Sequence, residues 1–335
     1  PAAFRRDFVQ PSRPVLLAEL MDGWRCATAG GAAFVSALSD QRVLVGSDAD
    51  GHSVSMVMRD FLRYAKNNRD RNPFLVFDSI IFDTLTATAA RALDGCTRPW
   101  YTVPTIFSDD DLLQHLDLVD RPLYRWLLVG SKRSGSFVHT DPQGTCAWNA
   151  LVSGAKHWVL FHPDTPREML AAKWVRKRRP GEDDDGEEGE EGEKLDSNAV
   201  DQWDDVRGWF HEDLPGIKAS VENYFAEKME EEEEGGGEGK PIVRCFEFVQ
   251  RPGEIVFLPS LWHHAVLNVE HSVAITQNFV DRENLELACA IMDRDGDTVC
   301  DGVRRLSEAL RERLQECRPD LAGTNPGTNP GTGVV

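Results

Sequence analysis

Ser136-Phe137-Val138-His139-Thr140-Asp141 is the stretch that most constrains the fold of this chain. It lies between two apolar runs, as expected of a β-strand in a sheet-rich domain. Residues two apart on a strand point to the same face, so the imidazole of His139 and the carboxylate of Asp141 can bind one ion. A second imidazole, from His264 or its neighbour His263, would complete the ligand set of an open iron(II) site. Such a site leaves coordination positions for a chelating cosubstrate and dioxygen. The pattern therefore predicts an oxygenase, and the alternative is a hydrogen-bonded His and Asp without a metal.

Three other His-x-Asp triplets compete with this one, at His115-Leu116-Asp117, His162-Pro163-Asp164 and His211-Glu212-Asp213. The first falls within 109–118, where an acidic start is followed by apolar residues at helical spacing, so its two side chains diverge. The second lies among prolines that favour a turn. The third lies between two acid-rich tracts, and we expect both the second and the third in surface loops.

The composition predicts a soluble globular protein. With 335 residues and 41% hydrophobic content, the chain can bury one large core or two modest ones. No apolar run approaches the roughly eighteen residues of a membrane span. Seven scattered cysteines without a Cys-x-x-Cys pair favour a reducing, intracellular compartment. Because the chain begins at Pro1 and not at an initiator Met, we expect a trimmed chain whose N-terminal targeting signal cannot be read.

Two acidic tracts hold much of the net charge of −19. Residues 182–193 contain nine acids and residues 230–238 contain six. Such runs cannot bury enough apolar surface to fold, so we expect both tracts to be solvated and disordered. The functional alternative is attraction of a basic protein partner and repulsion of nucleic acid. Residues 173–179 carry five cations, which either balance the first tract or form a nuclear-import patch.

The breaks in pattern divide the chain into four parts. Residues 1–105 mix helical and strand patterns, including a predicted helix over 56–64, and are expected to pack as a flange. Residues 106–281 show the short apolar runs of an all-β barrel or sandwich, interrupted by an acidic insertion at about 170–243. Residues 282–322 have the apolar spacing of two helices that pack or dimerise, and the repetitive tail 323–335 is expected to be disordered.

Within the barrel, residues 148–152 and 156–161 are predicted to form a hairpin across Ser153-Gly154. Lys156 shares its strand face with Trp158 and Leu160. A buried ammonium without a partner costs several kcal/mol, so this lysine either faces solvent or needs an anion. Further strands are expected at 253–259, 264–269 and 272–279. Neighbours on a strand point in opposite directions, so only one of His263 and His264 can face the metal, and alternation alone does not decide which.

The run His139-Thr140-Asp141-Pro142-Gln143-Gly144-Thr145-Cys146-Ala147-Trp148-Asn149-Ala150-Leu151-Val152 resembles the Jumonji C family of iron- and 2-oxoglutarate-dependent dioxygenases. Within that family, the resemblance is strongest to the branch of arginine demethylases and lysyl hydroxylases. Four blocks carry it, at 46–58, 122–126, 134–161 and 252–279. The resemblance implies a mainly β fold with flanking helices, a double-stranded β-helix or cupin-like jelly-roll barrel.

The resemblance also implies the roles of single residues. The iron ligands would be His139, Asp141 and His264, and the residues that bind 2-oxoglutarate would be Asn149, Lys156 and Thr276. A dicarboxylate would supply the anion that Lys156 needs. Ser136 would lie near the substrate, where the family has a threonine. Leu75 departs from the pattern, because the family branch has a tyrosine there that helps to hold the cosubstrate.

The activity implied by this resemblance is hydroxylation of a substrate carbon, coupled to conversion of 2-oxoglutarate to succinate and carbon dioxide. We expect a nuclear lysyl hydroxylase or N-methyl-arginine demethylase acting on basic peptides, since their charge suits an acidic enzyme. Alternatives are a hydroxylase of another substrate, such as a modified RNA base, and a scaffold without turnover, which the loss of the tyrosine at Leu75 would suit. The acidic balance argues against extensive nucleic-acid contacts. No membrane partner is expected, and the C-terminal helices are candidates for a homodimer contact.

Overall fold

A computed structural model describes residues 1–47, 52–82, 99–170, 206–234, 244–300 and 302–321. The predicted import patch at 173–179, the first acidic tract, residues 235–238 of the second tract, Cys96 and the tail 323–335 lie outside these residues. Across the described part of the chain, no helix combines the length and the apolar character needed to cross a bilayer.

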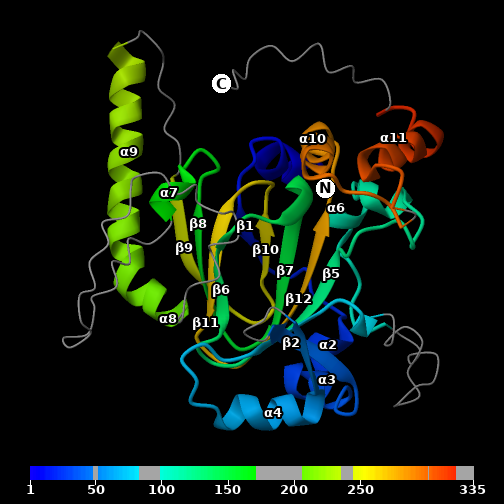
Figure 1. The fold of residues 1–335 in the computed structure, drawn as a ribbon, viewed down its shortest axis with the longest axis vertical. Coiled ribbons are helices and arrows are strands. Elements are labelled where there is room, and N and C mark those ends of the chain that lie inside the picture. The colour runs from blue at the N-terminus through cyan, green and yellow to red at the C-terminus, as the bar shows by residue number, and fades with distance from the viewer. Residues whose placement is uncertain (48–51, 83–98, 171–205, 235–243, 301, 322–335) are drawn as a thin grey trace, which may run out of the picture.

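Two antiparallel sheets form the centre of the molecule (Figure 1). Alternating residues on each strand face opposite sides, which allows both faces of both sheets to be covered. The larger sheet has the strand order β1 (Val15–Leu17), β10 (Ile255–Leu258), β7 (Cys146–Ser153), β12 (Ser272–Phe279), β5 (Arg125–Gly130) and β4 (Leu75–Asp78). The smaller sheet has the order β6 (Gly135–His139), β11 (His263–Asn268), β8 (Lys156–Phe161) and β9 (Cys245–Gln250).

The inner faces of the sheets pack on each other through a small apolar cluster. Trp158 and Val266 of the smaller sheet contact Ala147 and Val256 of the larger one, and all four are buried. This is the double-sheet arrangement of a jelly roll, and it confirms the predicted fold class. The N-terminal region does more than pack on the sheets, since its β1 and β4 pair with β10 and β5.

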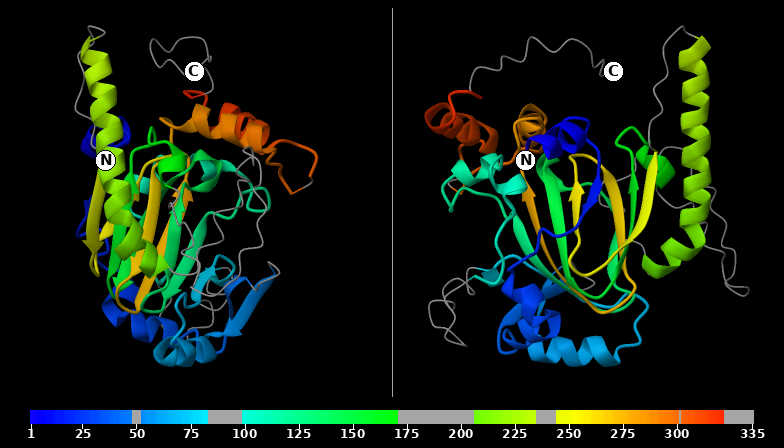
Figure 2. Two further views of the ribbon diagram at one scale, coloured as in Figure 1. Left: turned by 60° about the vertical axis from the view of Figure 1, so that its left-hand side comes forward. Right: turned by 180° about the vertical axis from the view of Figure 1, so that it is seen from behind.

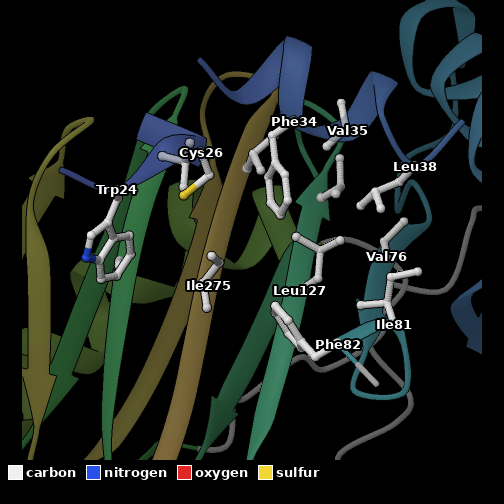
Figure 3. Packing of buried hydrophobic residues seen from close by; sticks show 14 of the residues in the cluster. Trp24, Cys26, Phe34, Val35, Leu38, Val76, Ile81, Phe82, Leu127 and Ile275 are labelled. Carbon is white, nitrogen blue, oxygen red and sulfur yellow. The ribbon is translucent and has the colours of Figure 1, made fainter. Parts of the chain in front are cut away.

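N-terminal residues pack on the outer face of the larger sheet. Phe34 and Leu38 lie against Leu127 and Ile275 of that sheet (Figure 3). The cluster extends to Trp148, which is fully buried and stacks on Phe107. The elements of this region are α1 (Ala2–Phe4), the π-helix η1 (Arg5–Val9), α2 (Arg25–Ala29), α3 (Gly31–Ser36), β2 (Arg42–Ser47), β3 (Ser53–Val57), α4 (Met58–Asn67) and α6 (Thr105–Ser108).

Helices of the insertion cover the outer face of the smaller sheet. The long helix α9 stands beside β8 and β9 in the different views of Figures 1 and 2. Val221 and Phe225 of α9 are buried in one cluster with Val159 and Leu267 of the sheet. The elements of this layer are α7 (Arg167–Leu170), α8 (Val206–Gly208), the π-helix η5 (Trp209–Asp213) and α9 (Leu214–Glu234).

Two C-terminal helices, α10 (Leu285–Asp295) and α11 (Leu306–Cys317), close one end of the sheets (Figure 1). They confirm the helical spacing predicted for this region. Their apolar faces are buried in a cluster with the 3₁₀ helix η2 (Leu112–His115). A second 3₁₀ helix, η3 (Pro142–Gly144), follows β6 and contacts α10.

The hairpin predicted across Ser153-Gly154 is wrong. β7 belongs to the larger sheet and β8 to the smaller one, so the short connection carries the chain from one sheet to the other. Gly154 has a φ of +90°, and a Cβ there would lie 2.2 Å from the carbonyl oxygen of His271. Ser153 and Gly154 therefore form a tight connection between the two sheets and not a hairpin turn, because β7 and β8 each pair with strands from other parts of the sequence.

Three local predictions also need correction. The helix expected over 56–64 begins at Met58, because Met56 pairs with Val43 in the two-stranded sheet of β2 and β3. His211 lies in the π-helix η5 and not in a loop, although its side chain is exposed. Part of the second acidic tract is helical, since α9 continues to Glu234. The buried first half of α9 anchors the helix, and glutamate is a good helix former that extends it.

Candidate metal centre

His139, Asp141 and His264 come together between the two sheets. One potential ligand atom from each lies within 4.8 Å of the others. The register of β6 and β11 pairs His139 directly with His264, and their ring centroids are 4.1 Å apart. Among the described residues, no other group of three His, Cys, Asp or Glu side chains meets this geometry. Of the four His-x-Asp triplets, the one that was chosen for its strand context is therefore the one that lies in this cluster.

Backbone carbonyls orient both imidazoles. The Nδ1 of His139 lies 2.7 Å from the carbonyl oxygen of Phe137, and the Nδ1 of His264 lies 3.0 Å from that of Trp262. An Nδ1 that donates its proton to a carbonyl leaves the Nε2 lone pair free to bind a metal. The competition between the two histidines is also resolved, because His264 lines the central cavity and His263 does not.

Burial shifts the pKa values of two of the three groups, His264 and Asp141. Burial lowers the pKa of His264 well below its usual range, and the positive charge of a protonated His139 would lower it further. Burial raises the pKa of Asp141, although His139 and a hydrogen bond from Asn278 act in the opposite direction. A neutral imidazole is the form that binds metals, while a cation bound here would favour the ionised carboxylate of Asp141.

A cavity of about 300 Å³ extends inward from this cluster. It is lined by the five other residues that the sequence singled out, namely Leu75, Ser136, Asn149, Lys156 and Thr276. These side chains come from five different strands of the two sheets, which only the tertiary fold brings together.

Lys156 lines this cavity, is buried, and has no carboxylate partner among the described residues. It is 4% exposed, and its Nζ makes no hydrogen bond or ion pair within the described residues. Burial lowers the pKa of Lys156 to about 7. The Oδ1 of Asn149 is likewise buried without a hydrogen-bond partner, while the Thr276 hydroxyl donates to the Trp148 carbonyl at 2.8 Å. Polar groups buried with unused capacity indicate a site for a polar ligand.

Asn278 is a site residue that the sequence reasoning missed. Its side chain lines the cavity, hydrogen bonds to Asp141 and donates to the Thr145 hydroxyl at 2.9 Å. It stands two residues after Thr276 on β12, so strand alternation places both on the same face. The signal was therefore present in the sequence.

A jelly roll with a His, Asp, His cluster between its sheets has the architecture of a metal-binding cupin. The family model described as a Cupin-like domain matches residues 1–284, so the chain belongs to this family.

Similar proteins also agree with the Jumonji C resemblance. The chain is 32% identical over 320 residues to the bifunctional arginine demethylase and lysyl-hydroxylase psr-1 of Caenorhabditis elegans, covering 95% of this chain and 66% of that protein. It is 32% identical over 280 residues to the lysine-specific demethylase JMJ21 of Arabidopsis thaliana, covering 84% of this chain and 24% of the relative. It is 25% identical over 311 residues to the 2-oxoglutarate and iron-dependent oxygenase JMJD4 of Gallus gallus, covering 87% and 60%. The chain thus spans two thirds or less of these relatives.

Proposed function

We propose that this chain is an iron(II)- and 2-oxoglutarate-dependent dioxygenase that hydroxylates side chains of basic proteins. The observation that carries the proposal is one cavity lined both by the His, Asp, His cluster and by a buried lysine that has no carboxylate partner in the described part of the chain. A metal explains the cluster and a dicarboxylate explains the lysine. The names of the relatives, which include iron-dependent oxygenases and demethylases, support the same activity.

The residues present fit both groups. His139, Asp141 and His264 would hold the metal, two nitrogens and one oxygen being suited to iron(II) with open positions. Lys156 would neutralise the distal carboxylate of 2-oxoglutarate, with Asn149 and Thr276 as neighbouring polar contacts. These roles rest on the shared cavity and on the unused hydrogen-bonding capacity of Lys156 and Asn149.

When bound, iron and 2-oxoglutarate supply the oxidising chemistry: dioxygen and 2-oxoglutarate are consumed, succinate and carbon dioxide are released, and one oxygen atom enters a substrate C–H bond. The chain itself holds and orients the reactants. Trp158, Val256 and Leu258 give the cavity buried apolar walls that exclude water. Ser136 lies on the wall formed by β6, close to His139 in sequence, and is our candidate for a substrate contact.

The proposed substrate is a basic peptide. The psr-1 relative is named for both arginine demethylation and lysyl hydroxylation, and the net charge of −19 favours cationic partners. Hydroxylation of a lysine carbon gives hydroxylysine. Hydroxylation of an N-methyl group on arginine gives a hemiaminal that releases formaldehyde. The acidic charge also makes extensive binding to nucleic acid unfavourable.

Turnover with an array of basic peptides tests this function. The chain is incubated with iron(II), ascorbate and 2-oxoglutarate, while succinate release and peptide masses are measured. We expect succinate from the parent, a gain of one oxygen or a loss of one methylene on a peptide, and no turnover from His264→Ala. His211→Ala is the matched control, because this exposed histidine belongs to another His-x-Asp triplet and should keep full activity.

The outcomes separate the alternatives. Absence of succinate with every peptide and with modified RNA would favour a scaffold without turnover. Product on RNA alone would contradict a peptide substrate. Nuclear import through residues 173–179 and pairing of two chains through α10 and α11 stay predictions, to be checked by imaging of a fluorescent fusion and by light scattering.

A further inference from the structure

The helix α10 packs directly on the turn that follows Asp141. This turn is η3 (Pro142–Gly144), where Gln143 has a φ of +58°. A Cβ on Gly144 would lie 2.6 Å from the Cδ1 of Ile291 and 3.4 Å from the Cα of Ala288, both in α10. The helix therefore lies as close to the turn as a glycine allows, and the path of the chain after Asp141 depends on where α10 lies.

One buried carbonyl joins this turn to two other segments. The carbonyl oxygen of Gly144 accepts hydrogen bonds from the Ser260 hydroxyl at 2.6 Å and from the Asn284 Nδ2 at 2.8 Å. Ser260 stands in the turn that leads into β11, which carries His264, and Asn284 is the N-cap residue directly before α10. The other atoms of Asn284 are also fixed, since its Oδ1 and backbone N–H bond to the backbone N–H and side chain of Asp281. The contact thus has little freedom to shift.

The turn is linked to the carboxylate of Asp141 through the side chain of Asn278. Directly after the turn, the Thr145 hydroxyl accepts from Asn278, and Asn278 also hydrogen bonds to Asp141. Within the turn, Gln143 hydrogen bonds to Asp297, beyond the C-terminal end of α10. Contacts from α10 therefore restrain the segment through which the Asp141 side chain is placed.

We propose that α10 positions Asp141 for metal binding and that Asn284 is the positioning residue. The inference rests on the proposed metal site. The Cupin-like match ends at residue 284, directly before α10, so the match assigns no role to the C-terminal helices. In this chain α10 packs on the turn after Asp141 and so supports the metal site. Groups that orient metal ligands typically change metal affinity by about 10- to 100-fold when they are removed.

Cobalt(II) binding to the full chain tests the inference without turnover. Asn284→Asp removes the donor to Gly144 but keeps a side-chain oxygen that can accept from the Asp281 N–H, so the second contact of this residue is retained. We expect this variant and Asn284→Ala to raise the cobalt dissociation constant about 10-fold or more and to shift the visible cobalt bands. Arg311→Ala is the matched control, since the Arg311–Glu286 ion pair links α11 to α10 without touching the turn, and it should bind like the parent.

The results distinguish a failure of the positioning role from a failure of the proposed metal site. If the parent binds no cobalt, the metal site and the inference are both wrong. If the parent binds and Asn284→Asp has an unchanged dissociation constant and spectrum, the metal site stands and the positioning role is wrong. An equal loss of affinity in Arg311→Ala would also overturn the role, because it would trace the effect to the general stability of the helices.

Discussion

At the scale of single residues, the protonation of Lys156 leads to a prediction that can be measured. Burial lowers the pKa of its amine to about 7, so at pH 8 about nine in ten of these amines are neutral. A bound carboxylate favours the ammonium and raises that pKa. Binding of 2-oxoglutarate at pH 8 should therefore take up close to one proton, and affinity should fall as pH rises above 7.

Calorimetry in buffers of different ionisation enthalpy measures this proton uptake. Lys156→Met should abolish the uptake and weaken binding by about 10-fold or more, as expected for loss of a charged hydrogen bond. Thr276→Val, which removes a neutral contact from the same cavity, should keep the uptake. Binding that releases protons, or that is independent of pH between 7 and 9, would contradict this role of Lys156.

Leu75 departs from the family pattern, and a single substitution can restore the tyrosine that the family branch has at this position. It lies in β4 and lines the same cavity as Lys156. Leu75→Tyr adds a hydroxyl that can donate to a carboxylate, and one such bond would tighten 2-oxoglutarate binding by about 10-fold. Leu75→Phe adds the ring without the hydroxyl and should leave the affinity nearly unchanged. Equal effects of the two variants, measured by titration, would show that ring volume is what matters.

Most residues of the candidate site could be named from the sequence, but some of their orientations could not. Strand alternation placed His139 and Asp141 on one face, and it would have placed Asn278 beside Thr276. The choice of His264 over His263 needed the resemblance, since alternation fixes relative facing and not which face is inward. That Lys156 has no carboxylate partner among the residues described by the structure could not be predicted, because it depends on all the strands around the cavity.

At the scale of elements, the connection between β7 and β8 shows the limit of local pattern. Ser153-Gly154 satisfies the requirements of a hairpin turn, but strand pairing is decided by residues far apart in the sequence, and here it separates the two strands. The same limit explains α9. Its acidic second half resembles a disordered tract, while its buried first half packs on the smaller sheet through contacts that composition does not reveal.

The crossing at Gly154 makes a stability prediction. Gly154→Ala would bring a Cβ to 2.2 Å from the His271 carbonyl oxygen at a φ of +90°, so both a clash and backbone strain oppose it. We expect the free energy of unfolding in urea to fall by about 3 kcal/mol or more. Gly253→Ala is the control, because its φ is +88° but nothing lies within 4 Å, and strain alone should cost about 1 kcal/mol. If Gly154→Ala lowered the free energy of unfolding no more than Gly253→Ala, the close approach of the His271 carbonyl would not be the reason for glycine at position 154.

At the scale of the whole molecule, helices surround the two sheets that enclose the cavity. N-terminal residues pack on the outer face of the larger sheet and insertion helices on that of the smaller one. In Figure 1, α10 and α11 close one end of the sheets, and α2, α3 and α4 lie at the opposite end. The inner faces are therefore free to carry polar residues, because the apolar burial needed for stability lies mainly on the outer faces. This arrangement explains how a fold can tolerate Lys156, Asn149 and Asp141 between its sheets.

The net charge of the molecule should affect the rate at which a substrate peptide is encountered, and should have little effect on the chemical step in the cavity. Residues 182–193 carry nine acids, and their field would draw a basic peptide toward the enzyme. Replacing this tract with a glycine-serine segment of equal length should raise KM for a basic peptide severalfold and leave kcat unchanged. The KM of the parent should also rise between low and physiological salt, whereas that of the replaced chain should change less, because salt screens the lost charges. Identical salt dependence of the two proteins would exclude a role of this tract in attracting the peptide.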